Sequence, residues 1–184
     1  METIYASKGF KKMFIAQIGA AVCLVLALIP IINLVAAIAA LAFSILNLIG
    51  LYEAGKNIEG CKTAFMITIA NIVLNVVTNI AGTGIIPFLL SIAGMVLQFL
   101  VTYFVCTSVA ETLRKTGSEE IARSGDLVWK INLVCYLASI VISVLVLVPL
   151  LSVIAVLANY VVMIATLVAS ILFLIFLYKS SAVL

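Results

Sequence analysis

The fold is decided by an uncharged stretch at residues 131–178, which reads INLVCYLASIVISVLVLVPLLSVIAVLANYVVMIATLVASILFLIFLY. A membrane-spanning helix needs about 20 apolar residues, so this stretch is too long for one span and about right for two. Pro149 lies inside it. Because proline is tolerated in the first turn of a helix, where its missing N–H loses no hydrogen bond, we expect a helical hairpin whose second helix begins at Pro149.

Two further stretches follow the same plan. Residues 13–51 and 64–108 carry no charge, and they contain Pro30 and Pro87. Of the 184 residues, 66% are hydrophobic and 9% are charged, whereas a soluble domain has about 25% charged residues. We therefore predict an all-α integral membrane protein with six transmembrane helices arranged as three hairpins.

The predicted hairpins form a single membrane domain over residues 1–184. They are expected at about 10–55, 61–117 and 126–179, with helices at 10–28, 30–54, 61–80, 87–116, 126–147 and 149–179. Gly55 and Gly117 follow the second and fourth helices, where a glycine in the left-handed conformation often ends a helix. A hairpin that dips into the bilayer and returns without crossing is the alternative to full spans.

The charge distribution predicts the orientation. All ten lysine and arginine residues lie near the open ends of the hairpins, and the proline turns carry no charge. By the positive-inside rule both termini are cytoplasmic. The first apolar run is far longer than the apolar core of a signal peptide, so we expect the first helix to be retained. Helices rich in Ile, Leu, Val and Ala, with four cysteines in no pairing pattern, favour a bacterial cytoplasmic membrane.

The longest polar segment, residues 111–130, is predicted to be a cytoplasmic loop. Glu111 and Lys115 are spaced to pair along a helix, and Ser118 followed by two glutamates is typical of a helix start. A short surface helix is therefore expected here. The loop is the best candidate for contact with a membrane or cytosolic protein partner, and a solvated connector is the alternative.

The three hairpins show signs of a degenerate triple repeat. Each follows a glycine with a charged residue nearby, namely Gly9, Gly60 and Gly125. The second and sixth helices end alike, at residues 51–53 and 177–179, which read LYE and LYK. Shared composition is the alternative explanation of these similarities.

The absent residues exclude several functions. The chain has no histidine, and no carboxylate lies inside an apolar stretch. Catalysis, proton-coupled transport and metal binding all lack the groups that they need, so we expect no enzyme and no cofactor. No segment is polybasic, which excludes nucleic acid as a partner and leaves the lipid bilayer as the first one.

Neutral polar side chains supply the candidate site. Residues 68, 71, 75 and 78 are spaced by steps of three and four, which places them on one face of the third helix. Shorter stripes on the other helices include Asn47, Thr102, Tyr136 and Ser170, and the first helix offers only Gln17. The candidate binding residues are Thr68, Asn71, Asn75, Thr78, Gln98, Asn132 and Asn159.

Two interpretations of these stripes remain open. The side chains either join helices by hydrogen bonds or line a polar cavity for a neutral small molecule. The first interpretation fits an accessory or interaction subunit of a membrane complex. The second fits a solute-binding or transport protein energised by a separate partner, or a lipid-handling protein. In size and six-helix plan the chain is similar to the substrate-binding subunits of energy-coupling-factor vitamin transporters, a similarity of architecture without a shared motif.

Overall fold

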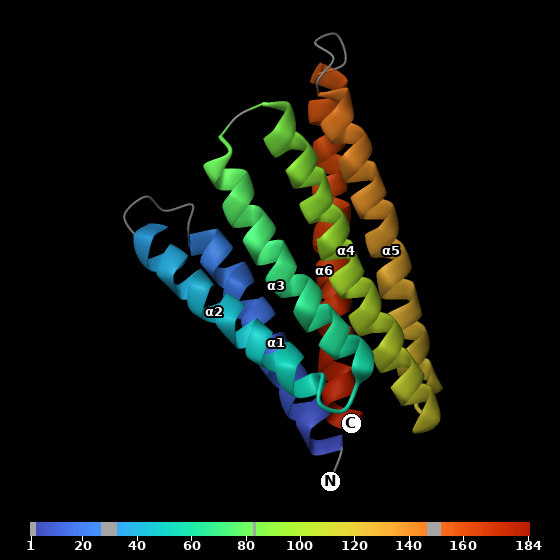
Figure 1. The fold of residues 1–184 in the computed structure, drawn as a ribbon. Coiled ribbons are helices and arrows are strands. Elements are labelled where there is room, and N and C mark those ends of the chain that lie inside the picture. Colours follow the sequence, from blue (N-terminus) through green and yellow to red (C-terminus); the bar gives the residue numbers. More distant parts are fainter. Residues whose placement is uncertain (1–2, 27–32, 83, 147–151) are drawn as a thin grey trace.

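The computed structural model describes residues 3–26, 33–82, 84–146 and 152–184. Six helices make up nearly all of these residues, and Figure 1 shows them alternating in direction with both chain termini at one end. We call this the terminal end, and the opposite end, where Gly82 and Gly84 connect two helices, the turn end. The helices are α1 (Thr3–Leu26), α2 (Asn33–Ala54), α3 (Glu59–Ile80), α4 (Ile85–Lys115), α5 (Glu119–Leu145) and α6 (Ser152–Val183).

Five helices are long and apolar enough to cross a membrane. Their mean hydropathies run from 1.7 to 2.8, and their apolar segments are Leu34–Ala54, Glu59–Ile80, Ile85–Lys115, Glu119–Leu145 and Ala155–Val183. The predicted first span, residues 10–28, extends past the described part of α1 and stays a prediction. An all-helical chain with five such helices fits the predicted all-α membrane protein.

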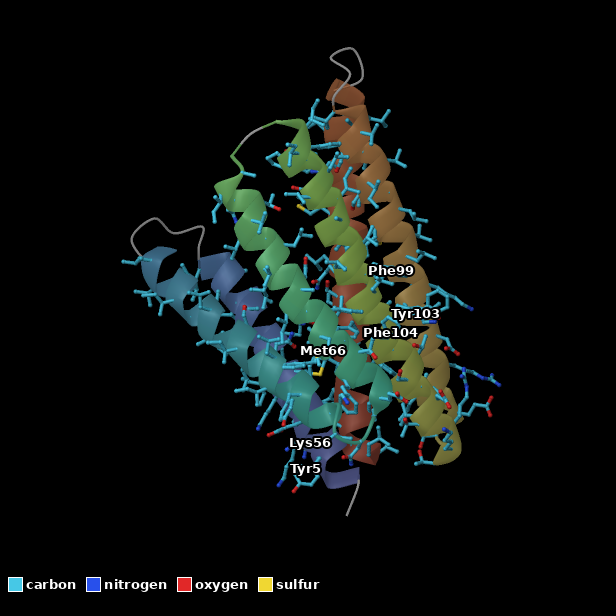
Figure 2. All side chains as sticks on the ribbon, in the orientation of Figure 1. Tyr5, Lys56, Met66, Phe99, Tyr103 and Phe104 are labelled. Carbon is cyan, nitrogen blue, oxygen red and sulfur yellow. The ribbon has the colours of Figure 1, made fainter. Side chains whose placement is uncertain are left out.

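The helices pack as a closed ring in chain order. Each consecutive pair makes contact, and α6 returns to pack against α1. Near the terminal end an aromatic pair crosses each seam between neighbouring hairpins (Figure 2 labels Tyr103). The ring centroids are 5.6 Å apart for Tyr52 and Phe65, 5.3 Å for Tyr103 and Trp129, and 5.4 Å for Phe14 and Tyr178.

Glycines bring the helices of each hairpin close together at the terminal end. A Cβ on Gly9 in α1 would lie 2.6 Å from the carbonyl oxygen of Gly50 in α2. A Cβ on Gly60 in α3 would overlap Ser108 in α4, and one on Gly125 in α5 would lie 2.7 Å from the Phe176 ring in α6. These are the three glycines that the repeat hypothesis places in equivalent positions.

The main cluster of buried hydrophobic side chains lies at the terminal end. The largest fully buried side chains include Phe10, Met13, Leu51, Phe176 and Leu177. Toward the turn end the hairpins diverge from one another (Figure 1), and apolar side chains such as those at positions 80, 85 and 161 are 80%, 78% and 68% exposed. The molecule is therefore a wedge, tightly packed at one end and open at the other.

The segment at residues 111–130 differs from its prediction as a loop with a separate short helix. Here α4 continues to Lys115, α5 begins at Glu119 rather than near residue 126, and only residues 116–118 connect them. An ion pair between Arg114 of α4 and Asp126 of α5 joins the two helices here, and Arg123 pairs with Glu119 within the first turns of α5. The predicted pair of Lys115 with Glu111 is confirmed at 2.9 Å.

The turn residues behave partly as predicted. Gly117 has a φ of 80°, and the Ser118 N–H donates to the Leu113 carbonyl, which confirms the left-handed helix end. The same prediction for Gly55 is wrong, because its φ is not positive; a Cβ there would lie 2.9 Å from the Cα of Lys62, so close approach is what requires glycine. Pro87 lies in the first turn of α4, as predicted. Pro30 and Pro149 lie outside the described residues.

Candidate functional site

Two adjoining cavities lie inside the ring, next to the packed terminal end. The first, of about 180 Å³, lies among α1, α2, α3 and α4, and its lining includes Gln17, Asn47, Thr68, Asn71 and Gln98. The second, of about 340 Å³, lies among α1, α4, α5 and α6, and its lining includes Gln17, Gln98, Thr102, Asn132, Tyr136 and Ser170. Gln17, Ala20 and Gln98 line both cavities, so the two form one polar region.

An amide pair joins α3 to α4 in this region. The Asn71 Nδ2 donates to the Gln98 Oε1 at 3.2 Å. One turn farther along α3, the Asn75 Nδ2 donates to the Asn71 carbonyl at 2.8 Å and to its Oδ1 at 3.3 Å. Asn75 therefore holds the Asn71 side chain in place from behind, while Asn71 and Gln98 face the cavity.

Most other polar side chains of the region bond to their own helix. The hydroxyl of Thr68 donates to the Ala64 carbonyl at 2.8 Å, and that of Ser170 donates to the Thr166 carbonyl at 2.9 Å. The Nδ2 of Asn132, which is 8% exposed, donates to the Val128 carbonyl at 2.9 Å. Such bonds do not join helices, and they leave oxygen lone pairs available to a molecule in the cavity.

Asn47 has an unsatisfied acceptor at the first cavity. Its Oδ1 is buried and has no hydrogen-bond partner among the described residues. Leaving a buried acceptor unpaired costs about 1–3 kcal/mol. A hydroxyl or N–H group placed in the cavity would remove that penalty.

The polar region carries no charge on its described lining residues. The ion pairs lie at the terminal end, where the Lys12 Nζ is 2.5 Å from the Glu53 Oε1 and Arg114 pairs with Asp126. Lys56 also lies there, between the rings of Tyr5 and Tyr52, at 5.3 and 5.1 Å from their centroids (Figure 2). The lining thus offers hydrogen-bond donors and acceptors, with neither a carboxylate nor an imidazole to act as a base.

The structure brings together some of the predicted site residues and separates others. Thr68, Asn71, Gln98 and Asn132 line the polar region. Asn75 and Thr78 continue the same face of α3 toward the turn end, beyond the cavity lining. Asn159 lines a separate cavity of about 310 Å³ between α5 and α6, because it lies about 16 Å along α6 from Ser170 at 1.5 Å per residue.

Six polar lining residues are absent from the predicted site although the sequence places five of them on polar stripes. They are Gln17, Ser44, Asn47, Thr102, Tyr136 and Ser170. The strongest missed signal is Gln17, the only amide in residues 13–32. A lone amide in an apolar helix has to find a polar environment, and here it lies where the two cavities meet.

Known proteins provide no further guide to this site. No protein-family model, curated protein or solved structure matches the chain.

Proposed function

We propose that this membrane protein binds a small uncharged hydrogen-bonding molecule in the two adjoining cavities and catalyses no reaction. One observation carries the proposal: every helix of the ring contributes a neutral polar side chain to the lining. In chain order these are Gln17, Asn47, Asn71, Gln98, Asn132 and Ser170. Helix bundles commonly build ligand sites from side chains that converge in this way.

The hydrogen-bond pattern favours binding over helix–helix joining as the purpose of these side chains. If they served only to join helices, most would bond across a helix interface. Among the described residues of the polar region, the Asn71–Gln98 hydrogen bond crosses a helix interface. Thr68, Asn132 and Ser170 instead donate hydrogen bonds to carbonyls of their own helices. Hydrocarbon cannot satisfy the remaining lone pairs, but a polar ligand can.

The triple repeat, which we include in the proposal, explains how one ring builds such a lining. We take Gly50, Phe104 and Phe176 as equivalent positions, since each lies next to the glycine of its own hairpin, the first two through the backbone oxygen and Phe176 through its ring. Counting six positions back from each gives Ser44, Gln98 and Ser170, and all three line the cavities. The repeat thus supports a site composed of equivalent positions from the three hairpins. The proposed orientation, with both termini cytoplasmic, places the open turn end on the outer side.

An accessory subunit of a membrane complex is the second candidate function. It is favoured by the open turn end, where α6 exposes a face of large apolar side chains. Leu157, Val161 and Ile164 are 65%, 68% and 63% exposed, and Tyr160 is 60% exposed. A partner helix packed there would cover these side chains, whereas in the binding proposal lipid covers them.

Native mass spectrometry of the protein purified in mild detergent tests the proposal. The wild type should retain a small molecule that Gln98→Leu loses by about tenfold, because the substitution removes hydrogen bonds in both cavities. Asn159→Leu is the matched control: it also removes an amide from the membrane region but lies outside the polar region, so it should retain the molecule. A bare wild-type chain, or equal retention by Gln98→Leu, would contradict the proposal. A stoichiometric protein partner in place of the small molecule would support the second candidate.

A further inference from the structure

We infer that the bound molecule is an amphipath with an uncharged polar head, which reaches the cavities sideways from the bilayer between α2 and α3. This inference rests on the proposed function and names the class of its ligand. Four observations carry it: the closed terminal end, the weak α2–α3 seam, the apolar side chains beside the first cavity, and the buried Asn47 oxygen.

The terminal end closes the cavities to a solute arriving from that side. Phe10, Met13 and Leu51 are at most 2% exposed, and so are Phe176 and Leu177. Across the three seams, aromatic pairs with centroids 5.3–5.6 Å apart complete this layer. A ligand therefore has to enter from the turn end or from the side.

The α2–α3 seam is the least extensive helix contact in the ring. It is also the boundary between the first and second hairpins, and the first cavity lies directly behind it with Ser44, Asn47 and Leu48 from α2 and Thr68, Asn71 and Ile72 from α3. In Figure 1 the two helices diverge from the terminal end toward the turn end. A molecule in the membrane meets less packing here than at any other seam.

The walls of this seam suit an apolar chain. Phe43, Leu48 and Ile72 line the first cavity beside its polar groups. On α3, Ile69 before Ile72 and Val76 after it are 41% and 54% exposed. An acyl chain lying along these side chains would keep its contact with the bilayer while its head occupied the cavity.

The polar groups define the head. The Asn47 Oδ1 accepts from a hydroxyl or N–H group, and no cation or anion of the described lining is present to pair with a charged head. Drug-sized ligands occupy pockets of about 300–1,000 Å³, so the first cavity, which lies next to the seam and has about 180 Å³, has room for a polar head while the acyl chain lies outside it along the seam. Hydroxyl- or amide-bearing heads, such as that of a diacylglycerol, meet both conditions.

Photocrosslinking in phosphatidylcholine nanodiscs tests the inference. The probe is a diacylglycerol with a diazirine in the acyl chain near the glycerol, and crosslinked sites are mapped by mass spectrometry. We expect crosslinks on α2 and α3 near Phe43 and Ile72. Their yield should fall about tenfold in Asn47→Leu, because the hydroxyl loses its acceptor. Asn159→Leu should crosslink like the wild type, and a phosphatidic acid probe with the same diazirine should crosslink weakly.

A second variant keeps the test valid if Asn47→Leu fails to fold. Ile72→Trp enlarges a side chain that is 45% exposed at the seam and removes no polar group. It should fold, as judged by a single size-exclusion peak, and should lower crosslinking at Phe43 by about tenfold as it fills the entrance. Crosslinks spread evenly over all lipid-facing helices, or equal yields from the charged and uncharged probes, would overturn the inference.

The two proposals fail in different ways. If the wild type retains a water-soluble molecule that Gln98→Leu loses, while the diacylglycerol probe gives no crosslinks at the seam, the binding site stands and the amphipath is wrong. If nothing is retained and no crosslink depends on Asn47 or Gln98, both are wrong.

Discussion

The two ends of the helix ring differ in how tightly their helices pack. At the terminal end, close-packed glycines, aromatic pairs and fully buried side chains hold the six helices together. Toward the turn end the three hairpins separate from one another (Figure 1) and expose apolar side chains to the surroundings. The polar cavities lie beside the packed core. The difference teaches that tight packing between the hairpins is concentrated at one end of the ring.

The largest difference between the two ends is expected when one large side chain is shortened at each of them. Phe176→Ala removes a fully buried ring that packs against Gly125, so we expect a loss of about 3 kcal/mol in unfolding free energy. Ile80→Ala shortens a side chain that is 80% exposed at the turn end and should change stability by less than about 0.5 kcal/mol. Thermal unfolding of the two variants in one detergent measures the difference. Equal losses would show that the two ends are equally packed.

A pair of glycine substitutions tests the same contrast by adding a methyl group. In Gly9→Ala the new Cβ would lie 2.6 Å from the Gly50 oxygen and 2.7 Å from the Ala54 nitrogen. Both are backbone atoms that cannot move aside alone, so α1 and α2 have to separate, at about 2 kcal/mol. Gly94→Ala is the control, because its Cβ would meet Asn71 Oδ1 at an ordinary 3.4 Å. The melting temperatures of the two variants test this explanation. If Gly9→Ala melts no lower than Gly94→Ala, close packing of α1 against α2 does not stabilise the terminal end.

Part of the fold follows from the sequence because its cause is local. Uncharged stretches long enough for two spans, with prolines inside them, predict helical hairpins, and Pro87 lies in the first turn of α4. The spacing of Glu111 and Lys115 predicts their ion pair in the same way. The start of α5 at Glu119 is also local, since Ser118 and the two glutamates after it indicate a helix start. The pairing of Asp126 with Arg114 on the preceding helix is not local, because the spacing of residues along one helix does not show it.

The candidate site was harder to predict because periodicity gives the face of a helix but not its neighbour or its depth. The stripe on α3 identifies Asn71, but only the packed ring shows that Gln98 of α4 accepts its hydrogen bond. Asn159 and Ser170 lie three turns apart on nearly the same face of α6, yet the polar region includes only Ser170. The two residues differ in their position along the helix axis relative to the cavities. The spacing of residues in a single sequence does not show that position.

The polar region itself should contribute to binding rather than to stability, unlike the packed end. In the double variant Asn71→Leu with Asn75→Leu, the α3–α4 amide bond and its support are lost. We expect retention of the bound molecule to fall by about tenfold, equivalent to ~1.4 kcal/mol, while the melting temperature of ligand-free protein changes little. Native mass spectrometry and thermal unfolding on one preparation separate the two effects. A double variant that melts far below the wild type yet retains the molecule would assign these amides to helix packing.

The last prediction has the smallest expected effect. It tests whether an ion pair adds to the stability that packing provides at the terminal end. The Glu53 Oε1 lies 2.5 Å from the Lys12 Nζ, while its Oε2 is buried without a partner among the described residues. Lys12→Met keeps the length of the side chain but leaves the carboxylate, whose side chain is 21% exposed, without this cation. Because the pair is only partly buried, we expect a loss of about 1 kcal/mol. Adding Glu53→Gln should restore most of it, since a neutral amide no longer needs the lysine. A double variant less stable than Lys12→Met would mean that the glutamate is held by its packing against α1 and not by the charge it pairs with.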